Sequence, residues 1–125
     1  MSMKIYLAAP FSEMPLMRKW AIQLQNAGHI CTSSWLNADP KDPWGNGQES
    51  ALIDLEDIDN SDALISFVLP DSTYPRGSRH VEFGYALAKG KIMINIGPGS
   101  ENIFHDLPQV SRFNTIEDAI VWLSK

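Results

Sequence analysis

The sequence predicts an α/β fold in which a parallel sheet carries helices on both faces. Apolar runs with the length of strands alternate along the chain with stretches whose apolar residues have helical spacing. The strand-like runs are apolar throughout, which is typical of parallel strands covered on both sides, and the alternation is the pattern of successive β-α-β units. With 125 residues the chain is long enough for one core, and we expect residues 1–125 to form a single domain.

Proline, glycine and apolar spacing place the elements of the first half. Pro10 ends the first apolar run, Gly28 stops the first helix, and residues 37–48 form a loop longer than most connections. The predicted elements are a strand over Lys4–Ala9, a helix over Met14–Ala27, a strand over His29–Ser33 and a helix over Glu49–Asn60. We expect the first helix to face the core with Leu16, Trp20, Ile22, Leu24 and Ala27.

The second half of the chain supplies three more strands, which makes five in all. Ala63–Leu69 and Lys91–Ile96 are apolar runs, and Ser78 is a suitable N-cap for the helix between them. The other predicted elements are a helix from Ser78 to Lys89, a helical turn at Ile103–Leu107, a strand over Arg112–Asn114 and a helix over Ile116–Ser124.

Charge and composition exclude several classes of function. The net charge of −5 argues against binding to nucleic acid polymers or anionic membranes. No apolar run approaches the ~20 residues of a membrane-spanning helix, and the N-terminus lacks a signal-peptide pattern. The single cysteine, Cys31, fits a reducing, cytoplasmic setting. The chain has no glycine-rich nucleotide fingerprint, and its three histidines are widely spaced, so we expect neither a cofactor nor a metal.

The topology predicts where a ligand would bind. In doubly wound parallel sheets, ligands collect at the carboxyl ends of the strands. Here Ala9, Pro10 and Phe11 follow the first strand, a loop follows Leu69, and a turn follows Ile96. We expect these three segments to meet at one binding edge.

Glu82 stands out at this edge, near the start of a helix and behind Arg76, Arg79 and His80. The positive end of the helix dipole and the basic neighbours are expected to keep it ionised. An ionised, fixed carboxylate suits nucleophilic attack on an electrophilic carbon such as a sugar C1. The alternative is that Glu82 is simply an acid at a helix start.

A second candidate acid lies in the segment ALIDLEDIDNSD. Asp54 follows two apolar residues and is expected to point inward, where it could protonate a leaving base or hold it. The alternative is a solvated acidic helix face, and this interpretation is preferred for Glu56, Asp57 and Asp59.

The segment RGSR, residues 76–79, is a candidate anion site. Gly77 and Ser78 at a helix N-terminus offer backbone N–H groups, and Arg76 and Arg79 would complement a phosphate. An ordinary surface loop with a cap is the equal alternative.

The four tryptophans fall into two groups. Trp20 and Trp122 have helical neighbours and are expected in the core. Trp35 and Trp44 lie in or beside the long loop, where they could stack on a base or cover the sheet edge.

Three segments together resemble a known family. KIYLAAPF, DLEDIDNSDALISFV and HVEFGYALAKGKIMINIG are similar to the nucleoside 2-deoxyribosyltransferases, a group that includes 2′-deoxynucleoside 5′-phosphate N-hydrolases and pyrimidine nucleotide N-glycosidases. The resemblance runs from Lys4 to about Ile96. Its most specific part is E-x-G-x-A-x-x-x-G-K from Glu82, combined with Asp54 eight residues before Asp62.

The resemblance implies a flavodoxin-like fold and a mechanism. Glu82 would attack C1′ of the sugar and form a glycosyl-enzyme, which water or a second base then resolves. Asp54 would assist the leaving base or orient the nucleophile, and Tyr6 would lie near Glu82. The ligand would be a nucleoside or nucleotide, and Trp35 is a candidate to contact it.

Two departures from the family pattern shift the expectation towards a nucleotide N-hydrolase. The transferases carry an acid before the glutamate, where this chain has Arg76 to His80, and they have a longer C-terminal segment. In relatives a neighbouring subunit completes the site, so we expect at least a homodimer, with Asn102 and His105 as candidates for that role.

Two other classes remain open at this point. One is a nucleotide-binding or regulatory module that keeps the fold without the chemistry. The weaker one is a phosphoacceptor domain, because the chain lacks the aspartate pair after the first strand that such domains need.

Overall fold

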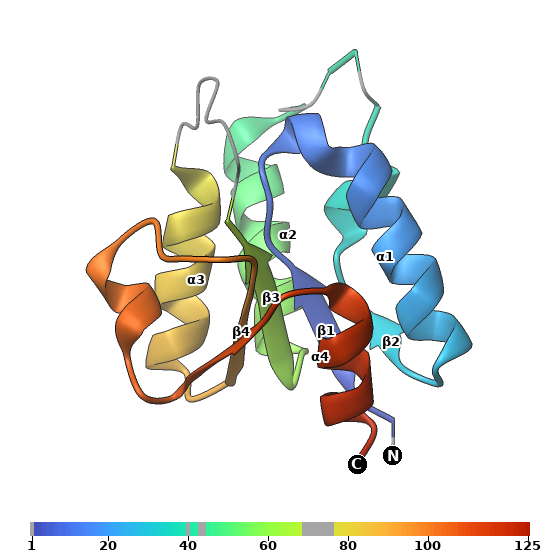
Figure 1. The fold of residues 1–125 in the computed structure, drawn as a ribbon. Coiled ribbons are helices and arrows are strands. Elements are labelled where there is room, and N and C mark those ends of the chain that lie inside the picture. The colour runs from blue at the N-terminus through green and yellow to red at the C-terminus, as the bar shows by residue number, and fades with distance from the viewer. Residues whose placement is uncertain (1, 40, 43–44, 69–76) are drawn as a thin grey trace.

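The chain folds into one layer of parallel strands between two layers of helices (Figure 1). The computed structural model describes residues 2–39, 41–42, 45–68 and 77–125. Five strands pair in the order β2-β1-β3-β4-β5, and every pairing is parallel. This is the flavodoxin-like order of doubly wound sheets, so the predicted fold class is confirmed.

The order of helices and strands matches the sequence-based prediction. The strands are β1 (Lys4–Leu7), β2 (Ile30–Cys31), β3 (Ala63–Phe67), β4 (Ile92–Ile96) and β5 (Val110–Phe113). The α-helices are α1 (Met14–Asn26), α2 (Gly47–Asp59), α3 (Ser78–Ala88) and α4 (Ile116–Leu123). Short 3₁₀ helices are η1 (Phe11–Glu13), η2 (Ser34–Asn37) and η3 (Ile103–Asp106).

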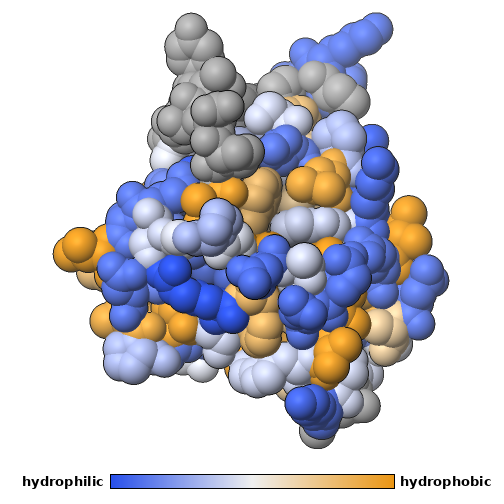
Figure 2. Space-filling model, viewed as in Figure 1, coloured by the Kyte–Doolittle hydropathy of each residue, from blue (hydrophilic) through white to orange (hydrophobic). Residues whose placement is uncertain are grey.

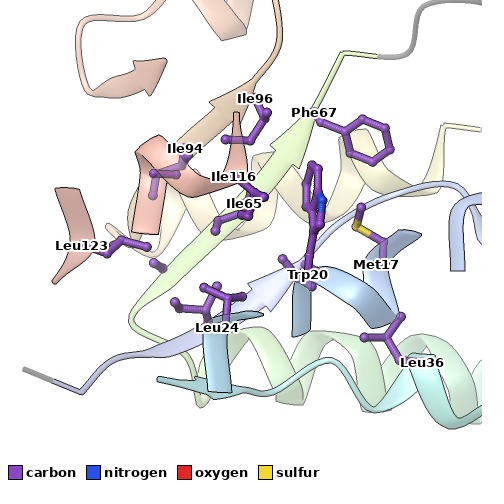
Figure 3. Packing of buried hydrophobic residues seen from close by; sticks show 14 of the residues in the cluster. Met17, Trp20, Leu24, Leu36, Ile65, Phe67, Ile94, Ile96, Ile116 and Leu123 are labelled. Atoms are coloured by element: carbon purple, nitrogen blue, oxygen red, sulfur yellow. The ribbon is translucent and has the colours of Figure 1, made fainter. Parts of the chain in front are cut away.

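Helices α1 and α4 cover one face of the sheet, and this face holds the larger apolar core (Figures 1 and 3). Side chains alternate between the faces along each strand, so every second strand residue enters this core. The strands contribute Ile5, Leu7, Ala63, Ile65, Phe67, Ile94 and Ile96. The helices contribute Met14, Met17, Trp20, Leu24, Ile116, Ala119 and Leu123.

Helices α2 and α3 cover the opposite face, where the apolar cluster is smaller. It consists of Tyr6, Ala8, Ile58, Leu64, Phe83, Ala86, Met93 and Val110. Ser66 and Asn95 continue the same rows of β3 and β4, and the Ser66 hydroxyl donates a hydrogen bond to Asn95 Oδ1 at 3.0 Å. This face therefore combines apolar packing with buried polar groups.

The orientation of α1 differs from the prediction. Leu16, Ile22 and Ala27 are exposed, although we expected them in the core. The buried positions follow the i, i+3, i+4 spacing of one stripe, and that stripe contains Met14, Met17, Trp20 and Leu24.

In the view of Figure 2, the outer surface shows no broad apolar patch, and hydrophilic side chains separate small apolar groups. Trp122 is one of the exposed apolar residues, because 41% of it is accessible to solvent, so its expected place in the core is wrong. Of the helices that the structure describes, none has the length and apolar character to cross a bilayer.

Candidate active site

Tyr6 and Glu82 meet on the α2/α3 side of the sheet. Tyr6 is fully buried in β1, and its hydroxyl donates a hydrogen bond of 2.5 Å to Glu82 Oε2. Glu82 reaches this position from the second turn of α3, which follows the neighbouring strand β3. The two residues are 76 positions apart in the sequence, and the sheet topology brings them together.

Asp54 joins this pair from α2. Its half-buried carboxyl group hydrogen-bonds with that of Glu82, which requires a proton between the two acids. The structure thus brings together Tyr6, Asp54 and Glu82, the three residues predicted to be catalytic.

Burial dominates the electrostatics of Glu82. It raises the pKa of Glu82 to about 8, the charge of Asp54 acts in the same direction, and the hydrogen bond from Tyr6 lowers the pKa. Burial also raises the pKa of Asp54. These pKa values belong to the coupled pair, which retains one proton at neutral pH.

Our expectation that Glu82 stays ionised because of its helix and its basic neighbours is therefore wrong for the isolated protein. The first turn of α3 holds no acid, and the helix dipole acts mainly within that turn. Desolvation favours the neutral form of a carboxyl group, and here it prevails.

Tyr6 remains a hydrogen-bond donor at all physiological pH values. Burial, followed by the negative charges of Glu82 and Asp54, raises the pKa of its phenol far above the usual range. A phenol in this state stabilises negative charge on Glu82 by donating to it.

Arg79 does not face this acid pair. Its guanidinium forms two hydrogen bonds of 2.6 and 2.5 Å with the Glu101 carboxylate, and its Nη1 lies 3.4 Å from the Phe67 carbonyl oxygen. Arg79 is only 4% exposed. This ion pair fixes the first turn of α3 to the segment after β4. The other arginine of the candidate anion site, Arg76, lies outside the described residues, as do Trp44 and the loop after Val68 up to that arginine.

The start of α3 also differs from the prediction. Gly77, not Ser78, is the N-cap, and its φ of +86° is a left-handed conformation that glycine adopts without strain. Ser78 is the first helical residue and is exposed. Both residues still lie at the helix N-terminus, where backbone N–H groups can receive an anion.

His80, Asn102 and His105 form a cluster beside the start of α3. The Asn102 amide nitrogen lies 3.3 Å from His80 Nδ1, and the two histidine rings are 5.9 Å apart. His105 Nδ1 accepts a hydrogen bond from the Glu101 N–H at 3.2 Å. His105 is only 1% exposed, so its side chain lies in the interior of its own chain.

Trp35 lies at the carboxyl end of β1. Its indole N–H donates to the Leu7 carbonyl oxygen at 2.9 Å, and its ring centroid is 6.2 Å from that of Phe11. Ala9, Pro10, Phe11 and Trp35 are all partly exposed at this edge. These residues, which we expected to contact the ligand, therefore lie at the carboxyl end of β1.

Asp57, three residues from Asp54, is not among the site residues that the sequence predicts. Asp57 was assigned to a solvated face, but it is half-buried and accepts two hydrogen bonds from Ser34. Its spacing of three residues from Asp54 was the available signal, since residues at i and i+3 share a helix face. Within the described part of the chain, no group of three or more potential ligands gathers as a metal site would require.

Neither a protein-family model nor a curated protein sequence matches this chain. Several solved structures share its fold. A CMP N-glycosidase, BcmB, of Clostridium botulinum is 21% identical with a TM-score of 0.65, and the match covers 96% of this chain and 97% of that one.

Two further structures match over almost their whole length. A 2-deoxyribosyltransferase of Bacillus psychrosaccharolyticus is 23% identical with a TM-score of 0.68, covering 94% of this chain and 90% of that one. A conserved protein of Enterococcus faecalis V583 is 19% identical with a TM-score of 0.67, covering 97% and 96%. At these identities the likeness establishes the fold.

Proposed function

We propose that this protein is an enzyme of the nucleoside 2-deoxyribosyltransferase group that cleaves the N-glycosidic bond of a nucleoside or nucleoside 5′-monophosphate. A 2′-deoxynucleotide is the preferred substrate class. The observation that carries the proposal is the buried acid pair Glu82 and Asp54 with Tyr6 bound to Glu82. The names of two similar structures, a CMP N-glycosidase and a 2-deoxyribosyltransferase, support it.

The mechanism uses the two carboxyl groups in different roles. Glu82 attacks C1′ as the carboxylate while the C1′–N bond breaks, and the electron pair of that bond passes to the base. Asp54 gives its proton to the departing base. Water or a second base then attacks C1′, the bond to Glu82 breaks, and the released proton returns to Asp54.

The proton that the pair holds in the isolated protein fits this division of roles. One carboxyl group must be neutral to donate a proton and the other ionised to attack. Glu82 holds the proton in the isolated protein, and the hydrogen bond between the two acids lets it pass to Asp54 in the substrate complex, where the hydrogen bond from Tyr6 stabilises the charge left on Glu82.

A 5′-phosphate would bind at the N-terminus of α3. Gly77 and Ser78 offer backbone N–H groups there, and His80 lies in the same turn. Arg76 remains a candidate for direct contact. Because Arg79 is engaged by Glu101, it supports the phosphate site by holding the helix start in place.

A second subunit would complete the site. Val81 on α3 and Ile103 and Phe104 on η3 are exposed large apolar residues. Val81 follows His80 in the sequence and the other two follow Asn102, and His80 and Asn102 are in contact. Such a group is typical of an interface between protein surfaces. Light scattering coupled to gel filtration should show a dimer or larger assembly, and a monomer at micromolar concentration would contradict this part of the proposal.

The test of the proposal is base release from a panel of deoxynucleosides and deoxynucleoside monophosphates, measured by HPLC with and without a second free base. Glu82→Gln should lower release at least about 10³-fold, equivalent to roughly 4 kcal/mol of the barrier. Glu56→Gln is the matched control, because it makes the same chemical change on an exposed part of α2.

The possible outcomes separate the candidate functions. Release from monophosphates in water alone indicates an N-hydrolase, and release that requires an acceptor base indicates a transferase. Acid-quenched enzyme should carry an added glycosyl mass in the wild type and none in Glu82→Gln. Binding of a nucleotide without release of base would favour the regulatory module.

A further inference from the structure

Asp57 is fixed in place by two hydrogen bonds to one of its oxygens. The Ser34 backbone N–H donates to Asp57 Oδ2 at 3.0 Å, and the Ser34 hydroxyl donates to the same atom at 2.5 Å. Accepting two donors on one oxygen is the pattern of a carboxylate anion. Asp57 thereby ties α2 to η2, the short helix that carries Trp35.

Asp57 lies on the same side of α2 as Asp54. The two residues are three positions apart, so their side chains are neighbours on the helix. Both are half-buried, whereas Glu56 and Asp59 on the other sides of the helix are exposed. A negative charge in this position acts on Asp54 through protein rather than through water, so it is only partly screened.

The described groups around this pair do not neutralise Asp57. Within residues 2–39, 41–42, 45–68 and 77–125, the titratable side chains that interact with Asp54 or Asp57 are Tyr6 from β1, Cys31 from β2 and Glu82 from α3. The cation Lys89 of α3 lies 3.7 Å from Asp59 instead, at the end of α2. None of these three facing groups carries a positive charge.

We infer that Asp57 is a positioning residue for the reaction proposed above: anchored by Ser34, it opposes negative charge on Asp54, so that the shared proton can pass from Glu82 to Asp54 and leave Glu82 as the anion when it attacks. The inference deepens the proposed function and rests on it. Tyr6 stabilises charge at one end of the acid pair, and Asp57 opposes charge at the other end. Two acids whose surroundings differ in this way are divided into a nucleophile and a proton donor.

Asp57 and Glu82 shift the pKa of Asp54 in opposite directions. Burial raises the pKa of Asp54, the hydrogen bond with Glu82 lowers it, and the charge of Asp57 raises it. Burial raises the pKa of Glu82, the hydrogen bond from Tyr6 lowers it, and the charge of Asp54 and the hydrogen bond with Asp54 both raise it, so the shared proton is on Glu82 in the isolated protein. The charge of Asp57 opposes this placement, because it disfavours negative charge on Asp54.

The test replaces Asp57 with a neutral residue of the same shape. In Asp57→Asn, the alkaline limb of the pH profile of kcat/KM should move down by about one pH unit, because Asp54 loses its proton more readily. Base release should then fall about tenfold at pH 8 and stay near the wild-type value at pH 6. Asp57→Ser also removes the charge and is the second variant if Asp57→Asn does not fold.

Two controls separate the local charge from other effects. Glu56→Gln removes one negative charge from the next position on α2 and should leave the alkaline limb in place. Ser34→Ala removes one hydrogen bond but keeps the charge, and it should shift the limb less than Asp57→Asn does. An unchanged limb in Asp57→Asn and Asp57→Ser, or an equal shift in Glu56→Gln, would overturn the inference.

A second readout needs no enzymatic activity. Carbon-13 NMR of aspartate carboxyl groups in the free protein should show Asp54 titrating at lower pH in Asp57→Asn than in the wild type. If the wild type released no base but this shift were present, the proposed reaction would fail while the effect of Asp57 on Asp54 stood. If base release occurred without the shift, the inference about Asp57 would fail alone.

Discussion

The two faces of the sheet are built for different purposes. Among the described residues, the face under α1 and α4 holds fifteen buried apolar residues in one cluster, whereas the face under α2 and α3 holds eight. The space on the second face is taken by polar groups, among them Glu82, Asp54, Ser66 and Asn95. The difference indicates that one face stabilises the fold, and that the other gives up apolar packing to hold the polar groups of the candidate site.

The largest effect on stability is expected from the polar face. Arg79→Ala should lower the free energy of unfolding by about 3–5 kcal/mol, because it removes a buried guanidinium from its ion pair with Glu101. Lys89→Ala is the matched control, since it breaks an exposed pair with Asp59 and should cost less than about 1 kcal/mol. Urea denaturation measures both. Equal losses in the two variants would show that the buried pair is not a structural support.

The apolar face should respond almost as strongly, but without a change in chemistry. Leu24→Ala on α1 should cost about 3 kcal/mol, because Leu24 is fully buried. Ile22→Ala, on the exposed side of the same helix, should cost about 0.5 kcal/mol or less. Base release per folded molecule should remain that of the wild type in both variants. A specific loss of activity in Leu24→Ala would contradict the division between the faces.

The sequence predicted the apolar face better in outline than in detail. Continuous apolar strands and helical spacing were enough for a parallel sheet with helices on both faces, and the flavodoxin-like fold followed from the family resemblance. They did not give the orientation of α1, because Leu16 and Ile22 fit a helical stripe nearly as well as Met14 and Met17 do. Packing between elements decides which stripe of a helix is buried, and the spacing of apolar residues within the helix does not predict that packing.

For the polar face, the sequence predicted particular residues but not their protonation or all of their partners. Tyr6, Asp54 and Glu82 were found from motif and resemblance, and the structure brings them together. The protonation of Glu82 and the partner of Arg79 were not predictable, since both depend on burial and on Glu101, which follows a later strand. Asp57 was missed because its partner Ser34 lies 23 residues away in the sequence.

Because burying the carboxyl group of Glu82 costs stability when it is charged, replacing Glu82 with a neutral residue should raise the free energy of unfolding. The pKa of Glu82 is about 8 in the folded protein, against an ordinary value near 4.5 in the unfolded chain. The unfolded state therefore releases this proton first, and the stability contributed by neutral Glu82 is lost as the pH rises from about 4.5 through 8. Glu82→Gln removes this dependence.

Thermal and urea denaturation across pH measure this effect. Glu82→Gln should match the wild type near pH 4 and exceed it by several kcal/mol at pH 8. Glu56→Gln should follow the wild-type curve throughout. A Glu82→Gln protein that is less stable than the wild type at pH 8 would show that Glu82 is compensated by charges outside the acid pair.

The smallest losses of stability are expected at two adjacent residues of β3 whose side chains point to opposite faces of the sheet. Ile65→Val removes one methylene from the apolar core and should cost about 1 kcal/mol. Ser66→Ala removes the hydroxyl that donates to Asn95 and should also cost about 1 kcal/mol.

Although these two losses of stability are similar, the effects of the two substitutions on hydrogen exchange should differ. Asn95 also contacts the Gly99 carbonyl oxygen and His105, so only Ser66→Ala should speed hydrogen exchange at the Glu101 N–H that His105 accepts. Equal exchange rates in the two variants would mean that the polar network under α3 is held by its other contacts, and that Ser66 contributes to packing alone.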